Sequence, residues 1–313
     1  MQNIKTCEFV SPKHPDKMCD FIADSLLDEF LDQDPKSRVA IEILGGHKNV
    51  TVSGEVTSNA NVDIIAVIKQ ILGDDYTINV YVSQQSPFIA QGVNPGGAGD
   101  QGIMIGYATA ETSNFMPQEY ELVRNLCKKI YEKYPFDGKT QVTIENGNVK
   151  TVIASFQNTR TPELEVLAHS IIDADEYLIN PAGEWTLGGF DADSGLSGRK
   201  IVIDNYGPET GIGGGSFSGK DYTKVDRSGA YMARRIAVDL LQKHGASKVR
   251  VKLAYAIGKI APVMAVASVD GKIERITGYD LSPRGIYEFL GLDKVKFSET
   301  AVWGHFGREF SWK

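Results

Sequence analysis

Apolar and polar positions alternate most clearly in residues 49–57, where valines alternate with small or polar residues. A period of two residues is typical of a strand that buries one of its faces. In residues 62–72, isoleucine and leucine recur at helical spacing, with Asn61 in position to cap the first turn. The pattern therefore predicts a strand followed by a helix.

A similar unit follows in the middle of the chain. Residues 140–144 and 149–156 predict a hairpin around the Asn146–Gly147 pair, which favours a tight turn. A helix is then predicted over residues 162–172, with Thr161 as its cap.

A third, looser unit lies near the C-terminus, where residues 249–257 and 263–269 predict two paired strands. The three units together suggest a threefold repetition of strands plus a helix. Two longer amphipathic helices are predicted over residues 116–134 and 228–244, and both are expected to be packing elements.

Composition narrows the functional classes. The formal net charge of −7 argues against a nucleic-acid binder, and no apolar run is long enough to span a bilayer. Residues 1–9 lack the apolar region of a signal peptide. The cysteines Cys7, Cys19 and Cys127 form no CxxC pair and are expected to be reduced and structural. We therefore expect a cytoplasmic protein with no membrane or nucleic-acid partner.

Two segments, residues 92–102 and 211–219, are too rich in glycine for regular structure. Such loops allow the backbone to approach a ligand closely. From Gly214 the second segment reads G-x-x-x-x-G-K, as a phosphate-binding P-loop does, but Asp221 stands where a P-loop has Ser or Thr. Backbone N–H groups and Lys220 still suit a phosphate, and a flexible loop with solvated lysines is the alternative.

Three further segments carry candidate chemistry. Arg199 and Lys200 are adjacent cations beside a glycine turn, suited to phosphate or to a plain surface turn. The run His14-Pro15-Asp16-Lys17 precedes a helical stretch over residues 18–31, so Asp16 either holds Mg²⁺ or belongs to a capped helix start. Asp100 lies between glycines and either meets a substrate amine or ribose hydroxyl, or forms an Asx turn.

Together these segments resemble the S-adenosylmethionine synthetase (methionine adenosyltransferase) family, in the family's order and along nearly the whole chain. GAGDQG from Gly97, and FSGKD with KVDRS from Phe217 to Ser228, are the most specific pieces. The other matching pieces are HPDK at His14, GE with Thr57 at Glu55, QSP at Gln85, QG at Gln91, GYAT-x-ET ending at Thr112, QVT at Gln141, INP at Ile179, GG at Gly188, GL-x-GRK ending at Lys200, YAIG ending at Gly258 and GHFGRE ending at Glu309.

The resemblance implies that the sulfur of methionine attacks C5′ of ATP and expels the triphosphate, which is then hydrolysed to pyrophosphate and phosphate. A thioether is already a nucleophile, so the site must mainly align the reactants and stabilise a highly charged leaving group. The resemblance also implies two Mg²⁺ ions per site, K⁺, and a homodimer or a dimer of dimers with its sites at the interface.

The implied fold is α+β, with three related βαβ-containing subdomains in pseudo-threefold repetition. Their expected ranges are 1–90, 97–187 and 188–313, with the three interwoven.

The resemblance assigns roles to individual residues. Catalytic roles fall to His14, Lys139, Arg199, Lys220 and Lys224. ATP would be bound by His14, Asp137, Lys139, Trp185, Asp193, Arg199, Lys200, Ser216 and Lys220. Methionine would be bound by Glu55, Gln85, Asp100, Asp193, Lys224 and Ile257. Asp16 and Asp226 would hold Mg²⁺, and Glu42 would hold K⁺.

The chain departs from the family pattern at several places. Lys13 replaces a glycine, Glu184-Trp185 replaces Arg-Phe, and Asn158 replaces a histidine. Residues 92–99 are shorter than the family's gating loop, and residues 155–175 are compressed.

Two other functions remain open: a nucleotide-binding regulator without turnover, and a P-loop-like phosphotransferase. The retained phosphate-binding candidates weigh against the regulator, and Asp221 weighs against the phosphotransferase.

Overall fold

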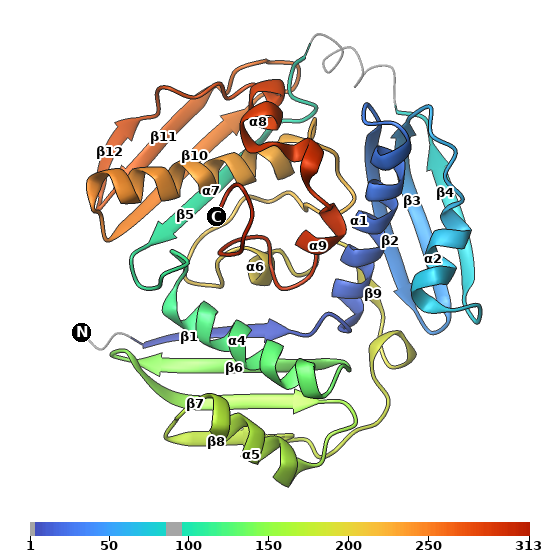
Figure 1. The fold of residues 1–313 in the computed structure, drawn as a ribbon, viewed down its shortest axis with the longest axis vertical. Coiled ribbons are helices and arrows are strands. Elements are labelled where there is room, and N and C mark those ends of the chain that lie inside the picture. Colours follow the sequence, from blue (N-terminus) through green and yellow to red (C-terminus); the bar gives the residue numbers. More distant parts are fainter. Residues whose placement is uncertain (1–3, 86–95) are drawn as a thin grey trace.

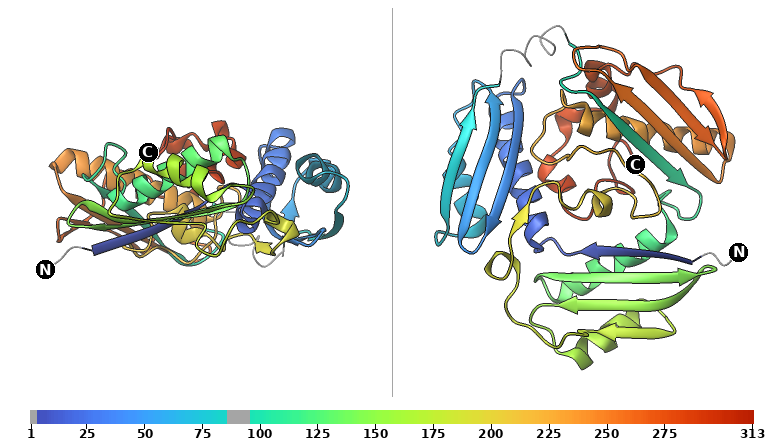
Figure 2. Two further views of the ribbon diagram at one scale, coloured as in Figure 1. Left: turned by 90° about the horizontal axis from the view of Figure 1, so that it is seen from below. Right: turned by 180° about the vertical axis from the view of Figure 1, so that it is seen from behind.

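The computed structural model describes residues 4–85 and 96–313, so the Gln91 motif and residues 92–95 of the predicted loop lie outside the described residues. Three four-stranded sheets surround a central group of loops and short helices (Figure 1). The main helices cover one face of each sheet and leave the opposite face open (Figure 2). The short central elements are η1 (Gly189–Asp191), α6 (Ile201–Asp204), η2 (Leu292–Lys294) and α9 (Phe297–Thr300).

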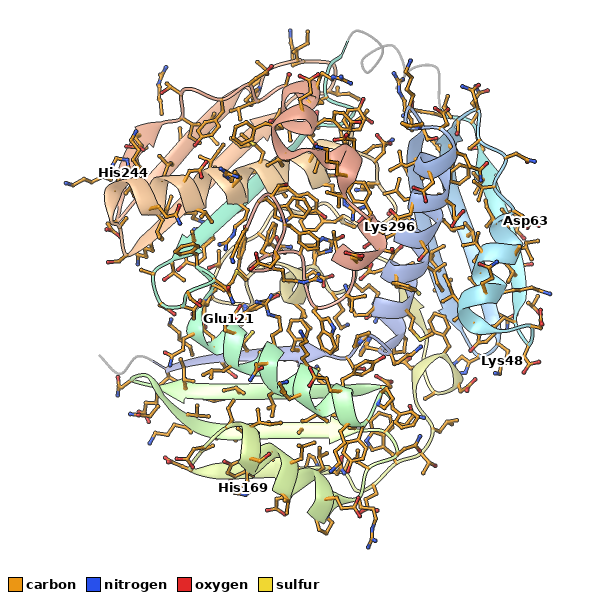
Figure 3. The ribbon with its side chains drawn as sticks, in the orientation of Figure 1. Lys48, Asp63, Glu121, His169, His244 and Lys296 are labelled. Atoms are coloured by element: carbon orange, nitrogen blue, oxygen red, sulfur yellow. The ribbon has the colours of Figure 1, made fainter. Side chains whose placement is uncertain are left out.

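The first sheet has the strand order β4-β3-β2-β9. Its elements are α1 (Pro15–Gln33), β2 (Arg38–Gly46), β3 (Asn49–Thr57), α2 (Ile64–Leu72), β4 (Thr77–Ser83) and β9 (Gly195–Leu196). The predicted strand and helix are confirmed, but the predicted cap Asn61 is wrong. The side chain of Asp63 caps α2 instead, by accepting the Ala66 N–H at 3.0 Å (Figure 3).

The second sheet has the order β1-β6-β7-β8. Its elements are β1 (Ile4–Val10), α4 (Gln118–Lys133), β6 (Gly138–Glu145), β7 (Asn148–Phe156), α5 (Thr161–Ile171) and β8 (Glu176–Ile179). The predicted hairpin is confirmed, and positive φ angles of 52° at Asn146 and 86° at Gly147 make its tight turn. The predicted cap Thr161 is wrong, since Arg160 occupies the N-cap and Thr161 is the first helical residue.

The third sheet has the order β12-β11-β10-β5. Its elements are β5 (Gly102–Thr109), α7 (Val225–His244), β10 (Lys248–Tyr255), β11 (Met264–Val269), β12 (Lys272–Arg275) and α8 (Pro283–Leu290). The predicted pairing of β10 with β11 is confirmed. The predicted helix over residues 228–244 begins three residues earlier, at Val225, which places Asp226 in its first turn.

The three sheets repeat one plan. A long helix (α1, α4 or α7) precedes an antiparallel hairpin, and a third strand is added beside the hairpin. In the first two sheets α2 and α5 cross over to a parallel third strand, which gives a βαβ unit. In the third sheet β12 instead follows β11 directly and pairs antiparallel to it. The predicted threefold repetition is confirmed, with this one variation.

Each sheet gains its fourth strand from a distant part of the chain. Strand β1 joins β6, β5 joins β10, and β9 joins β2, all antiparallel. Each of the expected ranges 1–90, 97–187 and 188–313 therefore contributes one strand to a sheet that belongs mainly to another range. The boundaries between the ranges remain a prediction.

The core lies between the sheets and their helices. Along β2, for example, Val39, Ile41 and Ile43 are buried while Glu42 and Leu44 are exposed on the open face. All three cysteines are free and buried, as expected for reduced, structural residues. No helix within residues 4–85 and 96–313 is long and apolar enough to cross a membrane.

Candidate active site

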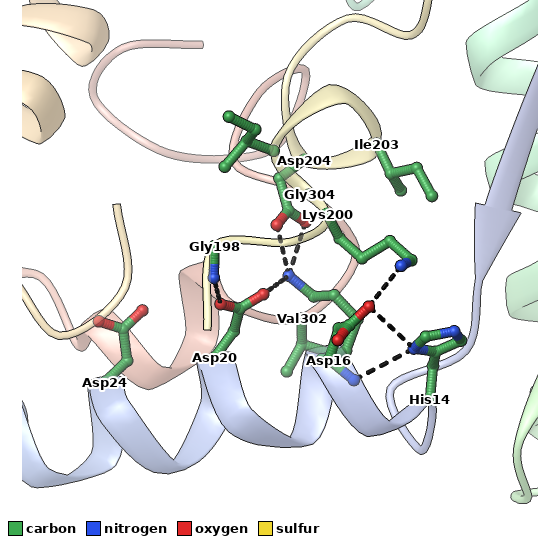
Figure 4. Close-up of polar contacts among 12 residues, drawn as sticks. His14, Asp16, Asp20, Asp24, Gly198, Lys200, Ile203, Asp204, Val302 and Gly304 are labelled. Atoms are coloured by element: carbon green, nitrogen blue, oxygen red, sulfur yellow. Dashed lines mark hydrogen bonds and ion pairs between the residues drawn. The ribbon is translucent and has the colours of Figure 1, made fainter. Parts of the chain in front are cut away.

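Helix α1 begins at the His14-Pro15-Asp16-Lys17 run. Pro15 occupies the first helical position, where its missing N–H costs nothing, and His14 is the N-cap. The imidazole Nδ1 of His14 accepts the Asp16 N–H at 3.2 Å, so the helix start fixes the orientation of this ring (Figure 4). The alternative of a capped helix start is thus part of the observed structure.

The carboxylate of Asp16 collects the cations of a second segment. It accepts the Leu196 N–H at 2.9 Å, pairs with Lys200, and lies 3.5 Å from Nε of Arg199. Burial acts to raise the pKa of Asp16, but the hydrogen bonds from Lys200 and from the Leu196 N–H outweigh it and lower the pKa. The carboxylate is therefore ionised at neutral pH. We call His14, Asp16, Arg199 and Lys200 the first cluster.

His14 is neutral at pH 7 in this setting. Burial and the positive charge of Lys200 together lower the pKa of its imidazole to about 4, against the opposing effect of Asp16. Because Nδ1 already accepts the Asp16 N–H, Nε2 carries the proton of the neutral ring. His14 can therefore donate one hydrogen bond to an anionic ligand.

Arg199 and Lys200 line a cavity of about 460 Å³ together with Glu8 and Gln141. Strands β1 and β6 pair there with Glu8 opposite Gln141, so both side chains lie on one face of the second sheet. Lys139 lies on that face two residues before Gln141 and forms an ion pair with Glu8. Lys139 is thus paired with Glu8, which lines the same cavity as Arg199 and Lys200.

A second cluster consists of Glu42, Ser216, Lys220 and Asp226. Nζ of Lys220 lies 2.9 Å from Asp226, and Ser216 Oγ donates to Glu42 at 3.3 Å. Burial raises the pKa of Glu42. Ser197 also donates to Glu42, and it is separated from Lys200 by only two residues, so the segment 196–200 joins the two clusters.

The glycines beside the second cluster are required by close approach. A Cβ on Gly215 would lie 2.1 Å from Cγ of Asp226, and one on Gly219 would lie 2.0 Å from the Ile41 carbonyl oxygen. Gly219 also has a φ of +78°, which L side chains rarely adopt. The glycine loop therefore packs closely against the Asp226 carboxylate and against β2. This packing argues against the alternative of a flexible loop with solvated lysines.

Lys224 and Asp221 explain the departure from a P-loop. Asp221 is fully buried, accepts the Val39 N–H at 2.7 Å and pairs with Lys224. Asp221 therefore anchors strand β2, and Lys224 is held against it.

Asp100 and Asp226 share a second cavity of about 710 Å³, lined also by Ile212 and the glycines at positions 211 and 213–215. Arg250 and Lys252 of β10 line it as well, and the sequence interpretation missed both. The sequence pattern of β10 contains the information needed to find them. Arg250 and Lys252 alternate with the buried Val249, Val251 and Leu253, so the period of two residues places both cations on the open face of the sheet.

The remaining predicted residues lie outside the two clusters, although the negative charge of Asp193 acts to raise the pKa of His14 in the first cluster. Asp137 accepts the Gly189 N–H at 2.8 Å, and burial raises its pKa. Asp193 accepts the Ser194 N–H, and Trp185 and Ile257 are partly exposed. The Oε1 atom of Gln85 is buried and has no hydrogen-bond partner among residues 4–85 and 96–313.

Glu55 has a closer relation to the second cluster. It lies opposite Ala40 in the β2–β3 register, and the neighbouring pair is Glu42 opposite Ser53. Glu42 and Glu55 therefore share the open face of the first sheet, as Lys139 and Glu8 share that of the second.

Comparison with known proteins identifies the family. The N-terminal, central and C-terminal domains of S-adenosylmethionine synthetase match residues 2–88, 95–185 and 187–313. The chain belongs to the S-adenosylmethionine synthetase family. The S-adenosylmethionine synthase of Mycoplasmopsis synoviae is 39% identical, and the match covers 100% of this chain and 95% of that protein. The S-adenosylmethionine synthase of Clostridium tetani is 38% identical, and the match covers 100% of this chain and 97% of that protein.

A solved structure agrees with this family assignment. The structure of an unusual S-adenosylmethionine synthetase from Campylobacter jejuni is similar with a TM-score of 0.89 and 30% identity, over 99% of this chain and 96% of that one. The predicted α+β fold with three related subdomains is thereby confirmed.

One departure from the S-adenosylmethionine synthetase pattern has a structural reason. Glu184 replaces an arginine, and its carboxylate accepts the Thr161 N–H at 2.7 Å. It thus satisfies an N–H at the start of α5, where the N-cap Arg160 makes no side-chain capping bond. The glutamate therefore has a structural role at the start of α5.

Proposed function

We propose that the two clusters form the triphosphate site of an S-adenosylmethionine synthase, which converts ATP, L-methionine and water to S-adenosylmethionine, phosphate and pyrophosphate. The observation that carries the proposal is the meeting of His14, Asp16, Arg199 and Lys200 beside the cavity wall with Lys139. These three cations, the neutral imidazole and Lys220 of the second cluster suit a leaving group with several negative charges.

In the reaction, a bond forms between the methionine sulfur and C5′ while the C5′–O5′ bond breaks, and its electron pair leaves on the triphosphate. No group need remove a proton from a thioether. Lys139, Arg199, Lys200 and Lys220 would stabilise the negative charge that develops on the leaving group, and neutral His14 would donate a hydrogen bond to it. Water then cleaves the triphosphate.

Mg²⁺ fits the carboxylates of Asp16 and Asp226. No group of three or more His, Cys, Asp or Glu side chains able to hold a metal ion occurs among the described residues. Mg²⁺ commonly takes one or two carboxylates and completes its shell with phosphates and water, so this donor set suits it. Bound there, the two ions would neutralise phosphate charge, and Glu42 would contribute an oxygen ligand for K⁺.

Further residues are proposed for the adenosine and methionine. Trp185 would stack on adenine, with Asp137, Asp193 and Ser216 near the nucleotide. Glu55, Gln85, Asp100, Lys224 and Ile257 would bind methionine, and Asp193 would contact both substrates. In support, the Oε1 atom of Gln85 is buried, has no partner in the described part of the chain and can accept a hydrogen bond.

We further propose a cytoplasmic homodimer, or a dimer of dimers, whose sites lie between open sheet faces. The open faces carry exposed apolar side chains, among them Ile4, Leu44 and Ile103. Glu42, Glu55 and Lys139 lie on the same faces, so packing two copies together there would bring candidate ligands from both to one site.

A single incubation tests the proposed function. The protein is mixed with ATP, methionine, Mg²⁺ and K⁺, and the products are identified by mass spectrometry. S-Adenosylmethionine, pyrophosphate and phosphate are expected. ADP would instead indicate a phosphotransferase, and bound nucleotide without product would indicate a regulator.

A further inference from the structure

Helix α1 carries an aspartate at every fourth position from its first turn, so four buried carboxylates share one face. Each accepts backbone N–H groups from a segment far along the chain. The bonds run from Leu196 to Asp16 at 2.9 Å, from Gly198 to Asp20 at 2.8 Å, from Gly219 to Asp24 at 2.9 Å, and from Phe297 and Ser298 to Asp28 at 2.7 and 2.9 Å. The row fastens three later segments to one helix.

Lys17 lies buried beside this row. Its Nζ donates to Asp20 at 3.0 Å and to both carboxylate oxygens of Asp204 at 2.6 Å (Figure 4). One lysine thus bridges two carboxylates, one from α1 and one from α6. None of these three residues is a proposed ligand of ATP, methionine or a metal ion.

The three residues hold both ends of the segment that carries two phosphate-binding candidates. Asp20 accepts the N–H of Gly198, and Asp204 ends the short helix α6, where its own N–H donates to the Lys200 carbonyl at 2.8 Å. Arg199 and Lys200 lie between these two attachments. A shift of Asp20 or Asp204 would therefore move their backbone.

Stability alone gives a weak reason for such a cluster. Removing charges from water costs free energy that the buried ion pairs only partly recover, so apolar replacements of similar volume are often as stable. The fixed geometry of the ion pairs has the clearer consequence, because a displacement of about 1 Å in a catalytic group can cost roughly 100-fold in rate.

We propose that Lys17, Asp20 and Asp204 form a positioning cluster that sets Arg199 and Lys200 against the triphosphate. The cluster acts on triphosphate binding and hydrolysis, and leaves methionine binding unaffected. This inference rests on the proposed roles of Arg199 and Lys200.

The test compares Asp20→Asn with Asp28→Asn. Both variants remove one buried charge from the same helix face, but Asp28 fastens residues 297 and 298, which have no proposed ligand role. The measurements are melting temperature, KM for ATP, KM for methionine, and the rate of hydrolysis of inorganic tripolyphosphate. For Asp20→Asn we expect a roughly tenfold rise in KM for ATP and a similar fall in hydrolysis, with KM for methionine within about twofold.

Asp28→Asn is expected to change the melting temperature alone. Equal kinetics of the two folded variants would overturn the positioning role. Asp204→Asn is the second variant if Asp20→Asn does not fold, with the same rise in KM for ATP expected and parental kinetics as the contrary outcome. Arg199→Ala and Lys200→Ala distinguish a failure of the proposed triphosphate site from a failure of the positioning role. If these two variants leave KM for ATP unchanged, both proposals fail. If they raise it while both aspartate variants do not, only the positioning role fails.

Discussion

At the scale of single residues, the chemistry depends on how charges pair. Asp16 holds Lys200 and Asp226 holds Lys220, so each proposed metal-binding carboxylate is balanced by a lysine. The sequence predicted these residue types and their grouping, because they lie within short recognisable motifs. It could not predict the partners, because Asp16 and Lys200 are 184 residues apart and meet only through the fold.

The effect of Lys200 on His14 can be measured directly. In Lys200→Met we expect the pKa of His14 to rise from about 4 toward its ordinary value, because a positive charge that favours the neutral ring is removed. NMR titration of the imidazole, assigned with His14→Asn, gives the value. Lys296→Met is the control, because Lys296 precedes α9 and pairs with Asp32 near the far end of α1 (Figure 3). An unchanged His14 pKa in Lys200→Met would contradict the assignment.

Lys220 is expected to act on the leaving group. We predict that Lys220→Ala lowers kcat roughly 100-fold while KM for methionine changes by less than about threefold, because the lost cation faces the triphosphate. Steady-state kinetics with each substrate varied separate the two constants. Lys243→Ala, on the exposed end of α7, should behave as the parent. Equal activity of Lys220→Ala and the parent would contradict a role of Lys220 at the leaving group.

At the scale of elements, the periodic patterns predicted the helices α1, α2, α4, α5 and α7 and the strands β3, β6, β7, β10 and β11, but none of the other described strands. Helix caps were predicted less well: Asn61 and Thr161 have suitable side chains, but Asp63 and Glu184 make the bonds. The Glu184 bond comes from 23 residues away, which no local pattern contains. The positions of Arg250 and Lys252 could have been read from β10, but their shared cavity required the glycine loop to fold beside them.

The capping role of Glu184 predicts a stability effect. Glu184→Ala should lower the free energy of unfolding by about 1 kcal/mol, because an N–H at the start of α5 loses its acceptor. Glu184→Gln keeps a carbonyl oxygen and should lose less. Denaturant titrations of both variants measure the difference. A fall in ATP affinity with unchanged stability would instead place Glu184 at the nucleotide.

Asp204 should make stability depend on pH. Burial raises its pKa to about 7 although Lys17 acts to lower it, and the nearby charges of Asp20 and Asp24 add to the rise. The pKa of an aspartate in the unfolded chain is about 4. Between pH 4 and pH 7, roughly, only the folded state keeps the proton, so the free energy of unfolding falls as the pH rises. The Asp204→Asn variant has no carboxyl group at this position and therefore lacks this contribution to the pH dependence.

The melting temperature of Asp204→Asn relative to the parent should therefore increase from pH 5 to pH 8. Calorimetry at several pH values measures this difference. A difference independent of pH would show that Asp204 does not titrate in this range.

At the scale of the whole molecule, the sequence resemblance predicted three related subdomains and their interweaving. The alternation of buried and exposed positions also predicts which face of each sheet is open. What covers that face is a property of two molecules, and a single chain's pattern shows only exposed apolar side chains such as Leu44 and Ile103.

The proposed dimer can be disrupted on one face. Leu44→Lys should shift the protein from dimer toward monomer and reduce adenosyl transfer by a similar fraction, because an exposed apolar contact becomes charged. Analytical ultracentrifugation and activity over a range of protein concentrations measure both effects. Val166→Lys, on the exposed side of α5, changes a comparable exposed residue and should alter neither. A dimer that survives Leu44→Lys with full activity would place the interface elsewhere.

The exchanged strands have a consequence for synthesis of the chain. Strand β1 is made first, but its partner β6 begins about 130 residues later, and the first sheet receives β9 only after residue 195 has been made. Until then its β2 edge has unpaired backbone groups, which favour association with other chains. A growing chain therefore cannot finish its three sheets one by one, and fragments ending near residue 90 or 187 should be prone to aggregate.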